Sequence, residues 1–139
     1  MAVRTLIVED SIAARTVLQK RFEEIGCRVV GIANNSAEGL EMFRRLRPQL
    51  VSLDLLMPDA DDLNSKDLFR IIRKEAPEVA VVIVSAQSKA AERSTYIREG
   101  AIEYFEKPFI KFQSLAEKLA RLFPDIQPLP PAGTRNRSH

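Results

Sequence analysis

Polar side chains follow the apolar runs of this sequence at positions where parallel strands would end. They are Glu9 and Asp10 after the first run, Asp54 after the third, Ser85 after the fourth and Lys107 after the fifth. Because ligands of open α/β sheets bind outside the carboxyl ends of the strands, we expect these groups to meet at one edge. The sequence therefore predicts a site with three carboxylates, a hydroxyl group and an ammonium group.

The three carboxylates indicate a cation site. Carboxylates in one crevice raise each other's pKa unless a cation neutralises them. Oxygen ligands without His or Cys favour Mg²⁺, which binds one or two carboxylates, several waters and a phosphate oxygen. Lys107 and Ser85 can then contact the outer oxygens of a phosphoryl group. Asp54 is the best candidate nucleophile, because it ends the middle strand and an aspartate can form an acyl phosphate.

Each of these residues also has a structural interpretation when it is taken alone. Asp10 and Ser85 can each cap the helix that follows. Asp54 can accept hydrogen bonds from loop amides, and Lys107 can be a solvated charge. The interpretation as a site depends on all of these groups reaching one edge of one sheet.

Two kinds of segment alternate along the chain and would position the site. Short, β-branched apolar runs predict strands at residues 3–8, 28–33, 50–53, 79–84 and 102–105. Helical spacing is seen in Ala14, Leu18, Phe22 and Ile25, in Leu40, Phe43 and Leu46, in Leu68, Ile71 and Ile72, in a weaker segment at 89–99, and in Leu115, Leu119 and Leu122. Ser11 and Ser36 are predicted N-caps, and Gly26 and Gly100 are predicted helix stops.

A helix after every strand predicts an α/β fold, because parallel neighbours need crossover connections. Right-handed crossovers leave few topologies. We expect a flavodoxin-like three-layer sandwich, with a five-stranded parallel sheet in the order 2-1-3-4-5 and five helices.

The composition is that of one globular domain and excludes several kinds of site. The chain has 139 residues and a net charge of +2, and its 6% aromatic content argues against direct binding of nucleic acid. A single Cys27 and a single His139 exclude an internal disulfide, a cysteine-based zinc cluster and histidine chemistry. No apolar run approaches the roughly 20 residues of a membrane span, and no signal peptide opens the chain. We expect a cytoplasmic protein that does not bind membranes.

The composition changes after Phe123, where Pro124, Pro128, Pro130 and Pro131 precede a polar, basic end. Such a segment should neither continue a helix nor pack against a core. We therefore expect a folded domain over residues 1–123 and a Pro-rich tail or linker stub over 124–139.

Several short motifs together resemble the receiver domain of two-component response regulators. They are Leu6-Ile7-Val8-Glu9-Asp10-Ser11, Asp54 with Met57-Pro58, Ser85-Ala86, Gly100-Ala101, and Tyr104 ahead of Lys107-Pro108-Phe109. The resemblance covers residues 3 to about 122. Each motif is weak alone, but five in order at receiver-like spacing form a specific pattern.

The resemblance implies a role for each matched residue. It implies that Asp54 is the phosphoacceptor, and that Glu9, Asp10, Asp54 and the backbone carbonyl of Leu56 bind Mg²⁺. Ser85 would follow the phosphoryl group, and Lys107 would be its ion-pair partner. Tyr104 would be the switch aromatic, which turns from an outward, solvent-facing position to an inward one when Ser85 moves. A cis peptide before Pro108 would aim Lys107 into the site.

The implied activity is a phosphorylation switch rather than an enzyme with a substrate of its own. A histidine kinase phosphohistidine, or a phosphotransfer protein, would supply the phosphoryl group, and the domain would show only Mg²⁺-dependent self-phosphorylation and slow autodephosphorylation. The face formed by residues 89–99, 102–105 and 110–122 would change its contacts with a downstream protein or a fused output domain. A homodimer through this face is also compatible with the resemblance.

One loop departs from the receiver pattern. Receivers usually have a Gly shortly after the Met-Pro pair, whereas residues 59–65 contain none and are about three residues longer than usual. Asn64 could take the left-handed conformation in its place. Asp59, Asp61 and Asp62 are interpreted as a solvated acidic loop, with a second metal site or a partner contact as the alternative.

Three other functions fit these residues less well than the switch does. A phosphatase of the haloacid dehalogenase type needs a second Asp two residues after its nucleophile, where this chain has Leu56. A flavin or nucleotide site needs a phosphate-binding cradle after the first strand, but residues 9–15 begin with two acids. A degenerate receiver that only docks partners is disfavoured because all five motifs are filled.

Overall fold

The computed structural model describes residues 1–57, 63–86, 89–107 and 111–127. The strands are β1 (Val3–Val8), β2 (Cys27–Ala33), β3 (Leu50–Asp54), β4 (Ala80–Ser85) and β5 (Glu103–Glu106). The helices are α1 (Ile12–Glu24), α2 (Ser36–Leu46), α3 (Ser65–Glu75), α4 (Ala90–Arg98) and α5 (Phe112–Leu122). Among these helices, none has the length and apolar character that crossing a bilayer requires.

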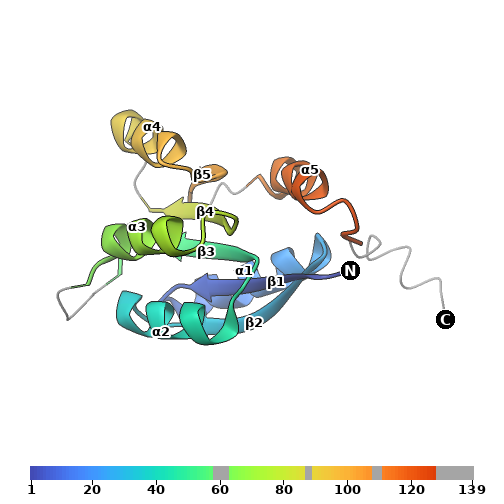
Figure 1. Cartoon of the computed structure of the whole chain (residues 1–139), viewed down its shortest axis with the longest axis horizontal. Helices are drawn as coiled ribbons and strands as arrows, with labels where there is room; N and C mark the ends of the chain where they lie inside the picture. Colours follow the sequence, from blue (N-terminus) through green and yellow to red (C-terminus); the bar gives the residue numbers. More distant parts are fainter. Residues whose placement is uncertain (58–62, 87–88, 108–110, 128–139) are drawn as a thin grey trace.

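All five strands form one parallel sheet in the order β2-β1-β3-β4-β5 (Figure 1). The predicted fold class and strand order are therefore confirmed. Parallel pairing places the carboxyl ends of β1, β3, β4 and β5 at the same edge of the sheet. Asp54 lies in register with Val84, and Ser85 with Glu106, so the polar residues that follow these strands are neighbours.

Helices cover both faces of the sheet, because the side chains of the inner strands are apolar on both sides. On one face, Phe43 of α2, Phe69 of α3 and Tyr96 of α4 belong to one buried cluster. On the other face, Phe22 of α1 and Leu115 of α5 belong to a second cluster. The two clusters hold the middle strand β3, and thus Asp54, in a fixed position.

The helix ends agree with the sequence signals at most positions. Ser11 caps α1, since its hydroxyl accepts a hydrogen bond from the Ala14 amide at 3.2 Å. The backbone turns through positive φ at Gly26 (101°) and Gly100 (113°), as predicted for helix stops. The prediction that Ser36 caps α2 is wrong: Asn35 is the N-cap, and its side chain accepts from the Glu38 amide at 2.8 Å.

The start of α3 differs from the expected loop geometry. Asn64 is not left-handed but extended, with φ −108°, and it forms a capping box with Asp67. An Asn that caps a helix takes this extended conformation so that its side chain reaches the amide three residues on. Residues 58–62, which include Asp59, Asp61 and Asp62, lie outside the described residues.

The chain continues to pack after α5, against the expectation for the Pro-rich segment. Ile126 lies against the second cluster, and the Gln127 amide donates to the Met1 carbonyl at 3.2 Å. The expectation that nothing after Phe123 packs against the core is therefore wrong for Ile126, because Gly26 leaves room for its side chain. Residues 128–139 lie outside the described residues, and the boundary at residue 123 stays a prediction.

Candidate functional site

The sheet brings the predicted acidic residues together. One carboxylate oxygen from each of Glu9, Asp10 and Asp54 lies within 4.8 Å of the other two. Glu9 and Asp54 are buried, with exposed fractions of 1% and 2%, and Asp10 is exposed. The loop after β1 and the end of β3 thus form an acidic cluster of two buried carboxylates and one exposed carboxylate.

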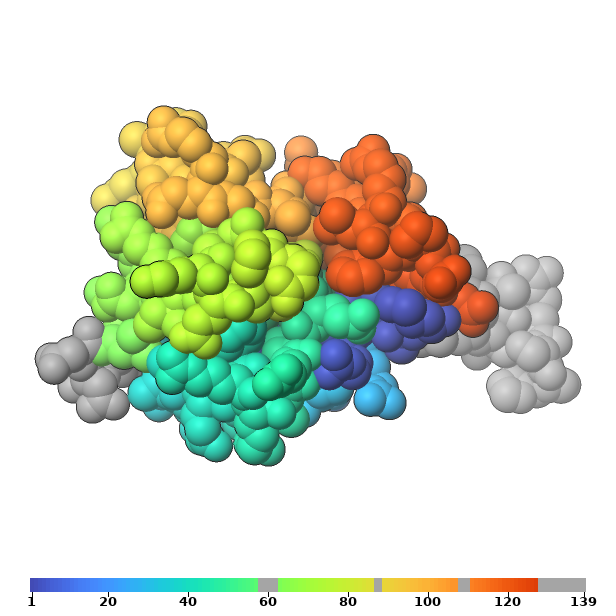
Figure 2. Space-filling view, in the orientation of Figure 1, coloured from blue at the N-terminus to red at the C-terminus, as the bar shows by residue number. Residues whose placement is uncertain are grey.

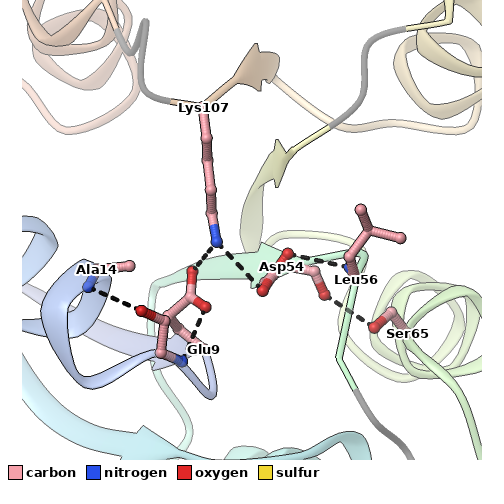
Figure 3. A network of polar contacts seen from close by, with 7 residues as sticks. Glu9, Ala14, Asp54, Leu56, Ser65 and Lys107 are labelled. Atoms are coloured by element: carbon pink, nitrogen blue, oxygen red, sulfur yellow. Dashed lines mark hydrogen bonds and ion pairs between the residues drawn. The ribbon is translucent and has the colours of Figure 1, made fainter.

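Lys107 extends from the end of β5 to the two buried carboxylates (Figure 3). Its Nζ lies 2.5 Å from Glu9 Oε1 and 3.3 Å from Asp54 Oδ2. The Lys107 amide also donates to the Ser85 carbonyl at 2.7 Å, which fixes the start of the side chain beside β4. Lys107 is therefore not merely a solvated charge, and its contact with Glu9 is one that the sequence did not indicate.

Two further contacts hold Asp54 in place. Its Oδ1 accepts a hydrogen bond from the Leu56 amide at 3.0 Å, which leaves Oδ2 facing Lys107 (Figure 3). The Ser65 hydroxyl donates to the Asp54 backbone carbonyl at 2.8 Å. No local sequence pattern identifies Ser65, because its partner is a backbone atom eleven positions away.

The structural interpretations of Asp10 and Ser85 are not supported. Ser11 rather than Asp10 caps α1, and Lys89 rather than Ser85 occupies the N-cap position of α4. Ser85 is buried at the end of β4, with an exposed fraction of 2%, next to the strand that carries Asp54. Both residues thus remain available for the roles that the resemblance implies.

The pKa values of the two buried acids are shifted in opposite directions. Burial, followed by the contact with Glu9, raises the pKa of Asp54 to about 7. For Glu9, burial opposes ionisation, but hydrogen bonds with Asp54, Lys107 and the Ser11 amide lower its pKa overall. Burial acts to lower the pKa of Lys107, but the contacts with Glu9 and Asp54 together raise it by more. The pKa is therefore raised overall, and the ammonium group stays charged. The site therefore contains more negative charge than Lys107 alone balances once Asp54 ionises.

This arrangement suits a small divalent cation. All three side chains offer carboxylate oxygens, the donors that Mg²⁺ prefers. Glu9 Oε1 is buried and forms a close ion pair with Lys107 Nζ, so the Glu9 carboxylate is held beside Asp54. The predicted contribution of the Leu56 carbonyl stays a prediction; the Leu56 side chain itself is 51% exposed.

Tyr104 occupies a different position from the one expected for the unmodified protein. Its side chain is not outward and solvent-facing but buried, with an exposed fraction of 3%. The Tyr104 hydroxyl donates to Glu92 Oε1 at 3.0 Å, and its ring lies 6.1 Å from that of Tyr96. These contacts on α4 account for the inward position. The predicted cis peptide before Pro108 lies outside the described residues.

Comparison with known proteins identifies the family. Residues 5–120 match the family described as the response regulator receiver domain. The chemotaxis protein CheY of Thermotoga maritima is 32% identical over 109 residues, which are 78% of this chain and 88% of that protein. The crystal structure of the response regulator domain of Thermotoga maritima CheB is 29% identical, with a TM-score of 0.66 over 92% of this chain and all of that one.

A longer relative matches nearly the whole chain. The protein-glutamate methylesterase/protein-glutamine glutaminase 2 of Methanosarcina acetivorans is 41% identical over 140 residues, which are 98% of this chain and 38% of that protein. The chain thus spans well under half the length of this relative. With the family match over residues 5–120 and the close similarity to a protein of its own length, the chain belongs to the receiver domains of two-component response regulators.

Proposed function

We propose that Asp54 accepts a phosphoryl group from a phosphohistidine of a histidine kinase or a phosphotransfer protein. An Asp54 carboxylate oxygen attacks phosphorus, the phosphorus–nitrogen bond breaks, and the imidazole leaves as the acyl phosphate forms. The observation that carries this proposal is that Asp54 lies beside Glu9 and Asp10, with Lys107 Nζ in contact with both Asp54 and Glu9. Its Oδ1 is held by the Leu56 amide, so Oδ2 is the oxygen positioned to react.

The acid cluster supports a requirement for Mg²⁺. Glu9, Asp10 and Asp54 would hold the ion, with the Leu56 carbonyl as the predicted backbone ligand. When bound, Mg²⁺ neutralises charge on the phosphoryl oxygens and on the carboxylates. The ionised form of Asp54 is the nucleophile, and any cation beside it favours that form over the protonated one.

Lys107 and Ser85 are proposed to stabilise the product. The Lys107 ammonium already lies 3.3 Å from Asp54 Oδ2, so a phosphoryl group on that oxygen would lie within its reach. Ser85 ends the neighbouring strand β4 and has a hydroxyl that can donate to a phosphoryl oxygen. Movement of Ser85 and Tyr104 is the proposed path to the face formed by α4, β5 and α5.

Exposed apolar side chains beside the site and on α1 support a protein as phosphodonor. Ile12 at the start of α1 is 72% exposed, Val17 on the same helix is 60% exposed, and Leu56 is 51% exposed. A protein that brings a phosphohistidine to Asp54 must cover this rim, and burying such side chains on docking stabilises the complex. Replacing Ile12 or Val17 by Asp should weaken transfer from a kinase and leave transfer from acetyl phosphate unchanged.

The experiment that tests the phosphoacceptor is intact mass spectrometry after incubation with Mg²⁺ and acetyl phosphate. We expect one base-labile phosphoryl adduct in the wild type and in Asp59→Asn, and none in Asp54→Asn. Lys107→Ala should form the adduct but weaken its effect on the rest of the domain. An equal adduct on Asp54→Asn would contradict the proposal and place the acceptor elsewhere, with Asp59 and Asp61 as the next candidates.

We also propose that the output is a fused domain of the methylesterase kind. The supporting observation is the 41% identity to the methylesterase relative, which extends over 98% of this chain and so includes most of the Pro-rich segment. Sequencing the gene past the codon for His139 tests this directly. A stop codon there would contradict it and favour a stand-alone receiver that acts by docking.

A further inference from the structure

Tyr104 makes a specific contact with α4 that fixes its inward position. Its hydroxyl donates to Glu92 Oε1 at 3.0 Å, and the two residues come from different elements, β5 and α4. The Ser85 side chain also forms a hydrogen bond with Tyr104. The Tyr104 hydroxyl thus lies between a strand residue beside Asp54 and an acid on the outer helix.

Two more aromatic rings give the inward ring of Tyr104 a packed environment. Tyr96 of α4 lies 6.1 Å from Tyr104 and 5.0 Å from Phe69 of α3, measured between ring centroids. Tyr96 and Phe69 are buried, with exposed fractions of 7% and 1%. Aromatic pairs at these separations stabilise each other beyond the area that they bury. A ring that turned outward would lose this packing and leave a gap beside Tyr96.

Glu92 has no competing ion pair among the described residues. The ion pairs of the described residues involve other acids, including Glu99, which directly follows α4 and pairs with Arg70. Glu92 is half-buried in the first turn of α4, close enough to β5 to accept from Tyr104. A hydrogen bond to a charged acceptor is stronger than one between neutral groups. Glu92 therefore has the position and the charge to hold the ring.

We propose that Glu92 is a positioning residue that holds Tyr104 inward before any phosphoryl transfer. The α4–β5–α5 surface comprises Ala90–Arg98, Glu103–Glu106 and Phe112–Leu122, and its α4 and α5 regions lie next to each other in Figure 2. With Tyr104 held inward, this surface is biased toward its switched arrangement in the unmodified protein. The meaning of this bias for signalling rests on the proposed function, but the position of the ring does not.

This bias limits how much phosphorylation can change the position of Tyr104. A modification shifts two states only by its differential affinity for them, so a ring that is already mostly inward has little further to move. When a phosphoryl group draws Ser85 toward Asp54, Glu92 keeps its hydrogen bond to Tyr104. Removing Glu92 should therefore lower the inward population of the unmodified protein and increase the change that phosphorylation produces.

The chain is well suited to a direct test, because it contains two tyrosines and no tryptophan. Ring-¹³C tyrosine labelling of the full chain gives two sets of signals, which Tyr96→Phe and Tyr104→Phe assign. A soluble paramagnetic agent then reports how exposed each ring is, without Mg²⁺ or phosphodonor. In the wild type we expect both rings to be shielded.

In Glu92→Ala, we expect the Tyr104 ring to become accessible as its inward-to-outward ratio falls by roughly tenfold, the effect of losing one charge-assisted hydrogen bond. Glu92→Gln keeps an acceptor oxygen and should restore most of the shielding. Glu99→Ala is the matched control, since it removes an acid at the C-terminal end of α4 that makes no hydrogen bond with Tyr104, and both rings should stay shielded.

Two results would overturn the proposal: a Tyr104 ring that is accessible in the wild type, or one that stays fully shielded in Glu92→Ala. Phosphorylation of the same samples keeps this test separate from the proposed function. Glu92→Ala should still form the Asp54 adduct with acetyl phosphate, because Glu92 is not part of the acid site. Absence of the adduct in every variant would contradict the phosphoacceptor role and leave the conclusion on the ring intact.

Discussion

The Asp54 carboxyl group is held in surroundings that oppose its ionisation. Burial and the contact with Glu9 raise its pKa from 3.8 to about 7. A carboxyl group whose pKa is higher in the folded state than in the unfolded state stabilises the fold below its unfolded pKa. That contribution is lost as the pH rises through the folded pKa. Ionised Asp54 therefore lowers the free energy of unfolding near and above neutral pH.

Asp54→Asn should remove the destabilisation that ionised Asp54 causes. Without divalent cations, we expect the variant to melt a few degrees above the wild type at about pH 8, with a smaller difference at about pH 5. Thermal unfolding followed by circular dichroism across this pH range measures the difference. Glu41→Gln, which changes an exposed acid, is the control and should show no such trend. A difference that is constant with pH would contradict the raised pKa.

Mg²⁺ should act on the same charges. Titration of the wild type, followed by backbone NMR, should give saturable shifts around Glu9, Asp10 and Asp54 at up to roughly tens of millimolar Mg²⁺, as expected for few protein ligands and several waters. Asp10→Asn should abolish these shifts. Asp67→Asn changes an acid outside the cluster and should keep them. The absence of shifts in the wild type would exclude the proposed metal ligands.

At the residue scale, the sequence predicted which groups meet but not how they pair. Strand ends identified Glu9, Asp10, Asp54, Ser85 and Lys107, because a parallel sheet aligns its carboxyl ends. The contacts of Lys107 with Glu9 and of Tyr104 with Glu92 depend on side-chain rotamers, which tertiary packing selects. No local spacing signals them.

At the scale of the elements, strands were predicted to within one residue, because continuous apolar runs mark strands that are buried on both faces. Helix starts were less certain. Asn35 and Ser36 are both good N-caps, and the choice between them depends on which backbone is extended. The start of α3 was not predicted, because the loop before it has no Gly to mark a turn. Asn64 and Asp67 nevertheless have the spacing of a capping box.

The capping box of α3 gives a prediction about this element. Asn64 Oδ1 accepts from the Asp67 amide at 2.9 Å, and Asp67 Oδ2 accepts from the Asn64 amide at 3.2 Å. Asn64→Ala removes the first bond and should lower the free energy of unfolding by about 1 kcal/mol, measured by urea denaturation. Asn64→Ser keeps an acceptor and should recover most of that loss. Equal losses in both variants would show that the cap does not contribute.

At the scale of the whole molecule, the two ends of the described chain meet. The Met1 amine donates to the Asp125 carbonyl at 3.0 Å, and Gln127 donates back to the Met1 carbonyl. Ile126 packs against Gly26, so closely that a Cβ on Gly26 would lie 2.6 Å from its Cγ1. Proline content alone suggested a loose tail from residue 124, because composition does not show that one apolar side chain finds a place on a distant glycine.

From this contact we expect substitutions at Gly26 and Ile126 to have non-additive effects on the free energy of unfolding. Gly26→Ala meets two costs, since its φ of 101° is unfavourable for a side chain and the new Cβ displaces Ile126. We expect a loss of about 2 kcal/mol in the free energy of unfolding, of which about half should disappear in an Ile126→Ala background, where only the backbone cost remains.

Gly100→Ala is the matched control for this double-mutant cycle. Gly100 has a similar φ of 113°, but its new Cβ would meet Arg73 rather than Ile126. Its cost should therefore be the same with and without Ile126, because distant sites without shared partners are additive. Urea unfolding of the six proteins that combine these changes gives both coupling energies. If Gly26→Ala costs as much without Ile126 as with it, the segment after α5 does not pack on Gly26 in solution.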